Sequence, residues 1–238
     1  MILELESLSK AFGTVKVADG LDLQLPEGAA LGVIGPNGAG KTSVFNLIAG
    51  ALRPDSGVIR FDGVDIGRLP TPARARAGIA RSFQIPKPFT EMTVFENLLV
   101  AAIFGGRRRE REAVDISAAV LAQTGLLPFA DRLAGTLTLL ERKRLELARA
   151  LATTPRLLLL DEIGGGLTEA ECGELVGAIA DIKAKGVTIV WIEHIVHALL
   201  AVVDRLLVLN FGCKIAEGEP RAVMASPEVR EIYLGIGA

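Results

Sequence analysis

Short apolar runs recur along the chain, and segments with a helical pattern separate them. Residues 2–8 and 21–25 alternate apolar and polar positions, which predicts two half-buried strands, and a short antiparallel piece is expected at 58–61. Continuous apolar runs predict buried strands at 29–34, 157–160, 188–192 and 206–209. Buried strands separated by helical segments are typical of a parallel sheet with crossover helices, so the sequence predicts an α/β fold.

The segment 88–152 has a different pattern from the rest of the chain. Its period is helical throughout, and it carries a dense run of charged residues at 107–111. This run fits a solvated helix face, and we interpret the whole segment as a helical subdomain inserted between strands. The expected organisation is a single domain over 1–238, with a core formed by 1–87 and 153–238.

A glycine-rich motif follows the apolar run at 29–34 and opens a helix expected at 43–52. The motif reads Gly35-Pro36-Asn37-Gly38-Ala39-Gly40-Lys41-Thr42 and fits the phosphate-binding loop G-x-x-x-x-G-K-[ST]. Glycine lets backbone N–H groups converge on phosphate oxygens, and the start of the helix adds partial positive charge. We expect Lys41 to reach the β- and γ-phosphates of ATP and the Thr42 hydroxyl to bind Mg²⁺, with Ser43 in the same site.

Two acidic residues follow the leucine run at 157–160. Asp161 and Glu162 would stand at the carboxyl end of a buried strand, the edge at which open parallel sheets bind ligands. Asp161 is expected to hold Mg²⁺, and Glu162 to polarise the attacking water. A polar strand end is the plainer interpretation, but the phosphate-binding loop argues against it. The sequence thus predicts ATP hydrolysis on a P-loop (RecA-like) core with an N-terminal antiparallel β subdomain.

Composition limits which partners and which cellular location this predicted ATPase is expected to have. Of the 238 residues, 50 % are hydrophobic, and 26 Lys and Arg against 28 Asp and Glu give a net charge of −2. No bulk attraction to nucleic acid is indicated, so no nucleic-acid partner is expected. No uncharged apolar run of about 18 residues and no signal peptide is evident, so the chain is expected to reach a membrane only through partners. Cys172 and Cys213 lie far apart and are expected to be reduced thiols.

Together these motifs resemble the ATP-binding-cassette (ABC) ATPases, and the resemblance covers essentially the whole chain. Phe12 matches the aromatic residue that stacks on adenine, and His194 matches the histidine that contacts the γ-phosphate. Gln84, in the run 81–84, matches the glutamine that senses Mg²⁺ and the water. The resemblance implies that two ATPase subunits close around ATP, and that transmembrane permease subunits bind near Gln84.

Within this family, the chain looks most like the ATPases of branched-chain amino-acid importers. Segments 43–46, 81–84 and 92–98 carry the likeness, and so does the tail from Ala216 to Gly235. The same style of tail occurs in ATPases of lipopolysaccharide transport, so lipid or lipopolysaccharide export is an alternative. A soluble, non-transport regulatory protein is another, although the chain has neither a second cassette nor a long coiled-coil insertion. The resemblance implies a peripheral position at the cytoplasmic face of the cell membrane.

The signature loop departs from the family pattern Leu-Ser-Gly-Gly-Gln. The matching run is Leu137-Thr138-Leu139-Leu140-Glu141, which lacks both glycines. Thr138 and Glu141 have the T-x-x-E spacing of a capping box, so a helix N-terminus is still expected there. We hypothesise that Thr138 and this helix end serve the nucleotide of a partner subunit, with weaker contacts than glycine gives. A nucleotide-binding module with little turnover is the corresponding alternative.

Overall fold

Six strands form the central sheet of the molecule, and the computed structural model describes residues 1–234. The strands are Ala30–Ile34 (β3), Ile79–Arg81 (β6), Leu157–Asp161 (β7), Thr188–Ile192 (β8), Arg205–Asn210 (β9) and Cys213–Gly218 (β10). Their order is β10-β9-β3-β8-β7-β6, with β10 antiparallel and the other neighbours parallel. The four buried strands predicted from apolar runs are confirmed as β3, β7, β8 and β9.

Hydrophobic packing on both faces holds this sheet in place. In β7, Leu158 and Leu160 join one core while Leu157 and Leu159 join the other, because successive side chains of a strand point to opposite faces. All four leucines are fully buried. Burial of each contributes about 1.5–3 kcal/mol relative to exposure. The end of β7, where the two predicted acids stand, is therefore firmly anchored.

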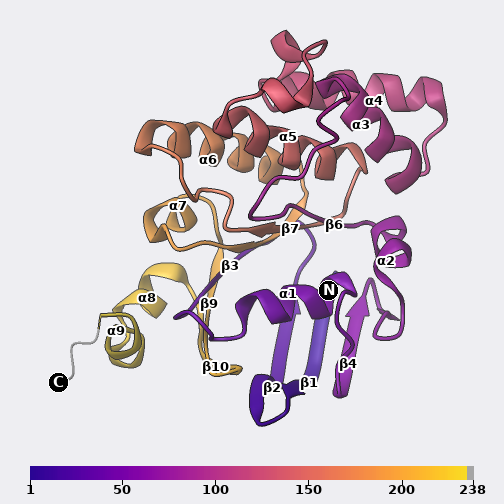
Figure 1. The fold of residues 1–238 in the computed structure, drawn as a ribbon. Helices are drawn as coiled ribbons and strands as arrows, with labels where there is room; N and C mark the ends of the chain where they lie inside the picture. Colours follow the sequence, from indigo (N-terminus) through magenta and orange to yellow (C-terminus); the bar gives the residue numbers. More distant parts are fainter. Residues whose placement is uncertain (235–238) are drawn as a thin grey trace.

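A second, antiparallel sheet packs with helix α1 (Lys41–Ala49) on one face of the central sheet. Its strands are Leu3–Phe12 (β1), Val15–Leu25 (β2), Ser56–Phe61 (β4) and Val64–Asp65 (β5). They run in the order β2-β1-β4-β5 and confirm the antiparallel strands predicted from alternation. In Figure 1 this sheet and α1 lie below β6 and β7 of the central sheet.

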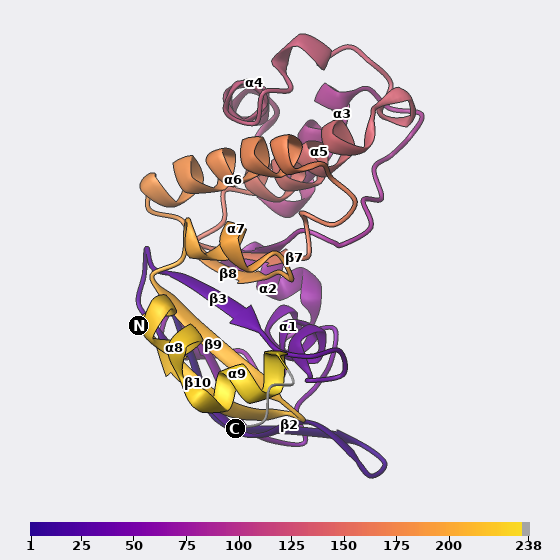
Figure 2. The ribbon, with the colours of Figure 1, turned by 90° about the vertical axis from the view of Figure 1, so that its left-hand side faces the viewer.

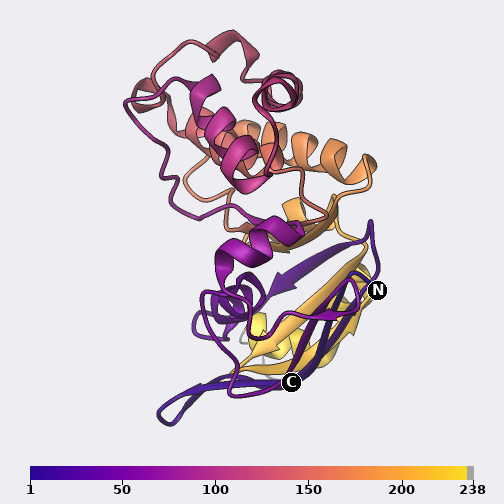
Figure 3. The same cartoon turned by 90° about the vertical axis from the view of Figure 1, so that its right-hand side faces the viewer.

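Most remaining helices cover the opposite face of the central sheet. These are Val94–Val100 (α3), Glu110–Gln123 (α4), Leu139–Ala152 (α5), Glu169–Ala184 (α6) and Val196–Leu200 (α7), with a π-helical turn at Ala101–Gly105 after α3. Short 3-10 turns occupy Leu127–Phe129 and Ala134–Thr136. The other helices are Thr71–Ala77 (α2), Pro220–Ala225 (α8) and Pro227–Leu234 (α9). Figures 1, 2 and 3 agree in placing α3 to α6 as a layer above the sheet.

Several local expectations differ from the structure. Helix α1 begins at Lys41, before the expected start, because the turn of the phosphate-binding loop leads directly into it. Strand β6 has only three residues, too few for an alternation to be recognised. In the charged run at 107–111, the helix begins only at Glu110, and Arg108 folds back to pair with Glu112 and to donate to the Thr154 hydroxyl.

Residues 1–234 bear on the expectations about membrane spans and cysteines. No helix there has both the length and the apolar character needed to cross a bilayer. Cys172 is buried and Cys213 half-buried, and both are free thiols as expected. The tail that carries part of the family likeness ends at Gly235, which lies outside the described residues.

Candidate active site

The glycine-rich loop lies between the end of β3 and the start of α1. Two of its glycines are required by the close approach of other strands. A Cβ on Gly35 would lie 2.1 Å from the carbonyl oxygen of Leu209 in β9, and one on Gly40 would lie 2.2 Å from that of Val17 in β2. Gly40 also has a φ of 101°, which side chains disfavour. The loop backbone is thus packed closely against two strands, which leaves no room for side chains at these two positions.

A cavity of about 300 Å³ opens over this loop. It is lined by seven consecutive residues predicted to bind the nucleotide, namely Asn37, Gly38, Ala39, Gly40, Lys41, Thr42 and Ser43. Glu162 also lines it, so the structure brings one of the predicted acids to the phosphate-binding loop. Val15 and Val17, from the β1–β2 hairpin, complete the wall. Sequence reasoning missed these two valines, whose alternation with Lys16 in β2 was a signal that both stand on one face of the hairpin.

The ammonium group of Lys41 is folded into the loop. Its side chain is buried, and Nζ donates to the carbonyl oxygens of Gly35 at 2.7 Å and Pro36 at 3.0 Å. Burial lowers the pKa of Lys41, while the negative charges of Glu162 and Asp161 act in the opposite direction. A buried cation of this kind is stabilised by an anion in the adjoining cavity, which fits the phosphate groups of a nucleotide.

The carboxylate of Glu162 joins two segments from different strands. Gln84 Nε2 donates to Oε2 at 2.5 Å, and His194 Nε2 lies 2.6 Å from Oε1. The Glu162 amide donates to the Ile192 carbonyl at the end of β8, which holds β7 and β8 together here. Glu162 has a φ of 48°, a strained conformation that recurs at active sites. Three residues predicted separately therefore converge beside the phosphate-binding loop.

Thr42, Gln84 and Asp161 line a second cavity, of about 520 Å³. Their hydroxyl, amide and carboxylate oxygens are hard ligands of the kind that Mg²⁺ prefers. Residues 1–234 contain no cluster of three His, Cys, Asp or Glu side chains that could hold a metal. Because the protein offers a single carboxylate among these three, phosphate oxygens and water would complete the coordination shell. The donor set fits Mg²⁺ that is bound together with a nucleotide.

Two charged neighbours of these residues were missed by sequence reasoning. The Arg81 guanidinium lies 2.6 Å from Oδ2 of Asp161 and donates to Oδ1 of Asn46 at 2.5 Å. Glu193 is buried, and its carboxylate accepts the backbone N–H of His194 at 2.9 Å. Arg81 stands in the run 81–84, three residues before the predicted glutamine, and Glu193 directly precedes the predicted histidine. For Glu193, a charged residue directly after a predicted buried strand was the available signal, whereas the strand that ends in Arg81 was not predicted.

Phe12 lies at the end of β1, at the tip of the β1–β2 hairpin. It pairs with Val15, one of the valines that line the cavity over the phosphate-binding loop. Half of Phe12 is exposed, and the Lys10 ammonium lies 5.4 Å from the centre of its ring. The ring is thus accessible near the phosphate site, which suits the predicted stacking on adenine.

Comparison with known proteins identifies the family. A family model described as "ABC transporter" matches residues 18–164, a span that includes the phosphate-binding loop and both predicted acids. The chain belongs to the ABC transporter ATPases. A second model, described as "Branched-chain amino acid ATP-binding cassette transporter", matches residues 213–238 of this ABC ATPase.

Relatives of this ABC ATPase match it from end to end. The high-affinity branched-chain amino acid transport ATP-binding protein BraF of Pseudomonas aeruginosa is 40 % identical over 249 residues, and the match covers 98 % of each chain. The corresponding protein LivG of Escherichia coli K12 is 37 % identical with the same coverage. The solved structure of the ADP conformation of MJ1267, an ATP-binding cassette of an ABC transporter, matches with a TM-score of 0.90 and 35 % identity over 99 % of each chain. The predicted fold class and ATPase family are confirmed.

Thr138 lies apart from the phosphate-binding loop of its own chain. It is the N-cap of α5, where its hydroxyl accepts the Glu141 amide at 3.4 Å and its own amide donates to the Glu141 carboxylate at 2.7 Å. The predicted capping box is therefore confirmed. Figure 2 shows α5 and α1 on opposite faces of the central sheet. A contact between Thr138 and the nucleotide of a partner ABC subunit stays a hypothesis.

Proposed function

We propose that this ABC ATPase hydrolyses ATP to drive uptake of branched-chain amino acids through a membrane permease. The observation that carries the hydrolytic part is the Glu162 carboxylate, which stands between Gln84 and His194 at the edge of the phosphate cavity. Support for the substrate comes from relatives named as branched-chain amino acid transport proteins and from the matching C-terminal family model. None of these names points to the alternative of lipid or lipopolysaccharide export.

Nucleotide binding would rest on the phosphate-binding loop. Backbone N–H groups between Gly35 and Thr42 donate to the phosphates, and the N-terminus of α1 adds partial positive charge. Lys41 moves from the carbonyl oxygens of the loop to the phosphates, which supply the anion that its buried charge requires. Phe12 stacks on the adenine ring. Thr42, Asp161 and Gln84 would hold Mg²⁺, which when bound neutralises charge on the phosphates.

Hydrolysis would be promoted by Glu162. Its carboxylate accepts a proton from the attacking water, while Gln84 and His194 hold that carboxylate in place from either side. The His194 side chain is half-exposed beside Glu162, and we propose that it contacts the γ-phosphate. Once that phosphate has left, the contact is lost, which makes the site a switch between ATP-bound and product states.

Two kinds of partner complete the proposal. A second ABC subunit would close over the nucleotide and present its signature helix, as Thr138 and α5 of this chain would do in return. Permease subunits would bind near Gln84, where the following residues carry large exposed apolar side chains: Phe83, Ile85, Phe89 and Met92. The helical segment 88–152 would move as a unit and pass the motion on. The complex would lie at the cytoplasmic face of the membrane, with this chain attached through the permease.

The decisive experiment reconstitutes the chain with its permease and second ATPase subunit in proteoliposomes. Labelled leucine should accumulate only when Mg-ATP is supplied on the side of the membrane that carries the ATPase. A complex with Glu162→Gln should not transport leucine. Hydrolysis without leucine uptake, or movement of labelled lipid in its place, would favour the export alternative. Phosphate release from the isolated chain separates an active ATPase from a module that only binds nucleotide.

A further inference from the structure

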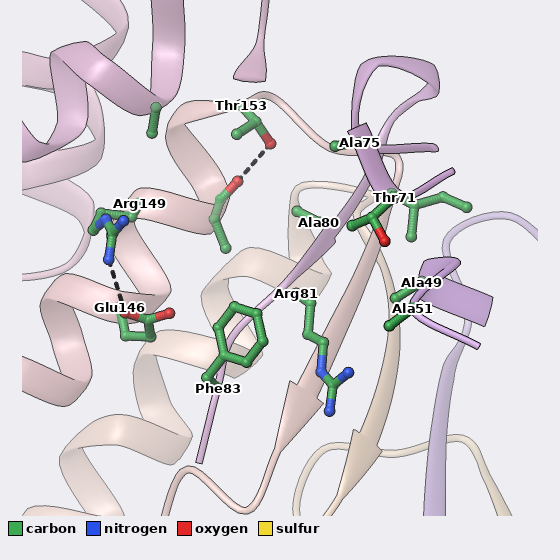
Figure 4. Close-up of a pocket in the computed structure, with 13 residues that line it drawn as sticks. Ala49, Ala51, Thr71, Ala75, Ala80, Arg81, Phe83, Glu146, Arg149 and Thr153 are labelled. Carbon is green, nitrogen blue, oxygen red and sulfur yellow. Dashed lines mark hydrogen bonds and ion pairs between the residues drawn. The ribbon is translucent and has the colours of Figure 1, made fainter. Parts of the chain in front are cut away.

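Arg81 occupies a buried position between the proposed metal site and the helical layer. It is the last residue of β6, the edge strand that pairs in parallel with β7. Only 11 % of its side chain is exposed. Figure 4 shows Arg81 on the wall of an apolar cavity of about 290 Å³, with its side chain extending away from Glu146 and Arg149 on the other wall.

Four neighbours fix the orientation of the Arg81 guanidinium. One nitrogen lies 2.6 Å from Oδ2 of Asp161, and another donates to Oδ1 of Asn46 in α1 at 2.5 Å. The guanidinium carbon lies 5.2 Å from the ring centre of Phe83 and 5.8 Å from that of Phe45. A planar cation held by two hydrogen bonds and two aromatic rings is not a loosely bound counter-ion that a metal would displace.

This arrangement divides the oxygens of Asp161 between two tasks. Arg81 takes Oδ2, whereas within residues 1–234 no hydrogen bond reaches Oδ1. Asp161 lines the cavity that also contains Thr42 and Gln84, the other two proposed metal ligands. A residue that hydrogen-bonds to a metal ligand commonly changes the affinity of the site for the metal, because it fixes the orientation of that ligand. Asn46 adds a link to the helix that begins at the phosphate-binding loop.

We propose that Arg81 is a positioning residue for the magnesium site: it holds Oδ2 of Asp161 so that Oδ1 is presented to Mg²⁺ bound with ATP. The inference rests on the proposed function, because it assumes that Asp161 is a ligand of Mg²⁺. This role requires the planar guanidinium group of arginine, with its separate donor nitrogens, and not a positive charge alone. Lysine presents its donors from a single nitrogen, so it does not reproduce the two contacts that separate guanidinium nitrogens make with Asp161 and Asn46.

The test measures nucleotide and metal affinity rather than turnover. A fluorescent ATP analogue is titrated into the parent and Arg81→Lys in EDTA and then at increasing Mg²⁺, and Mn²⁺ binding in the presence of ADP is followed by EPR. We expect Arg81→Lys to weaken metal affinity by about 10–100-fold. Its affinity for the analogue in EDTA should match that of the parent. Arg76→Lys, an exposed arginine on α2, is the matched control and should behave as the parent does.

A second variant keeps the inference testable if Arg81→Lys folds poorly. Asn46→Ala removes one contact of the guanidinium and leaves the Asp161 pair, so a smaller loss of metal affinity is expected. Unchanged or tighter Mg²⁺ binding in the Arg81 and Asn46 variants would overturn the inference, and so would an equal loss of affinity in EDTA. A parent protein that binds the analogue without any dependence on Mg²⁺ would instead overturn the proposed function, and this inference with it.

Discussion

His194 Nε2 lies 2.6 Å from Oε1 of Glu162, although 32 residues separate the two in sequence. If this carboxylate is the general base, Glu162→Gln removes proton acceptance and keeps the shape of the site. We expect turnover to fall by about 10²–10⁴-fold. ATP binding should persist, and size analysis with ATP should show a trapped dimer. A variant that remains monomeric with ATP would argue against closure of two subunits around the nucleotide.

Replacement of His194 tests whether this histidine acts in ATP hydrolysis or is an ordinary surface histidine. His194→Ala removes one of the two groups that hold the Glu162 carboxylate, so phosphate release should slow by about tenfold or more while binding persists. His197→Ala, an exposed histidine three residues further on, is the matched control and should hydrolyse ATP at the parent rate. Equal effects of the two substitutions would remove His194 from the site.

Lys41→Met should separate binding from stability. The variant loses the cation that meets the phosphates, so we expect affinity for ATP to fall by about 10²-fold, comparable with the loss of a charged hydrogen bond of about 1.5–3 kcal/mol. Stability without nucleotide should not fall, because burial disfavours the charged form of Lys41 and lowers its pKa. Thermal unfolding with and without ATP measures both effects. Lys185→Met, an exposed lysine, is the control.

The two leucines of the signature loop offer a gain-of-function test. Leu139 is exposed and Leu140 half-buried in the first turn of α5. If their side chains keep a partner's nucleotide at a distance, changing both to glycine should raise ATPase activity in the assembled pair. Glycine in a helix costs about 0.5–1 kcal/mol per residue, so the unfolding temperature should fall slightly. An unchanged or lower rate would contradict the idea of a weakened contact.

Glu146 is expected to make the free energy of unfolding depend on pH. Its carboxyl group is buried in α5, where burial raises its pKa above the ordinary value, and Arg149 at 3.1 Å opposes this shift. The folded state therefore binds the proton more tightly than the unfolded state. The stabilising contribution is complete below the unfolded pKa and is lost as the pH rises through the raised folded value.

Glu146→Gln imitates the protonated form at every pH. We expect the unfolding temperature of this variant to rise relative to the parent as the pH increases from about 4 to 8, across the range in which a raised carboxyl pKa lies. Glu110→Gln, at an exposed carboxyl on α4, is the matched control. A constant difference between Glu146→Gln and the parent over this range would show that the buried carboxyl does not titrate as proposed.

Local sequence was sufficient where one short segment carries the whole structural requirement. The glycines and Lys41 of the phosphate-binding loop act within eight consecutive residues, and the capping box of Thr138 and Glu141 spans one helical turn. The four consecutive leucines of β7 predicted a strand buried on both faces, because both faces of such a strand are apolar. Strand β6 escaped notice because three residues carry no period.

The sequence alone determined the loop that holds phosphate, the strand that ends in two acids, and the family to which both belong. Only the tertiary structure decided that Glu162 meets Gln84, 78 residues away, and that Asp161 meets Arg81, 80 residues away. The physical reason is that β3, β8, β7 and β6 are parallel neighbours, so their carboxyl ends share one edge. Which side chains touch there depends on register and packing between strands, and no local pattern records either of them.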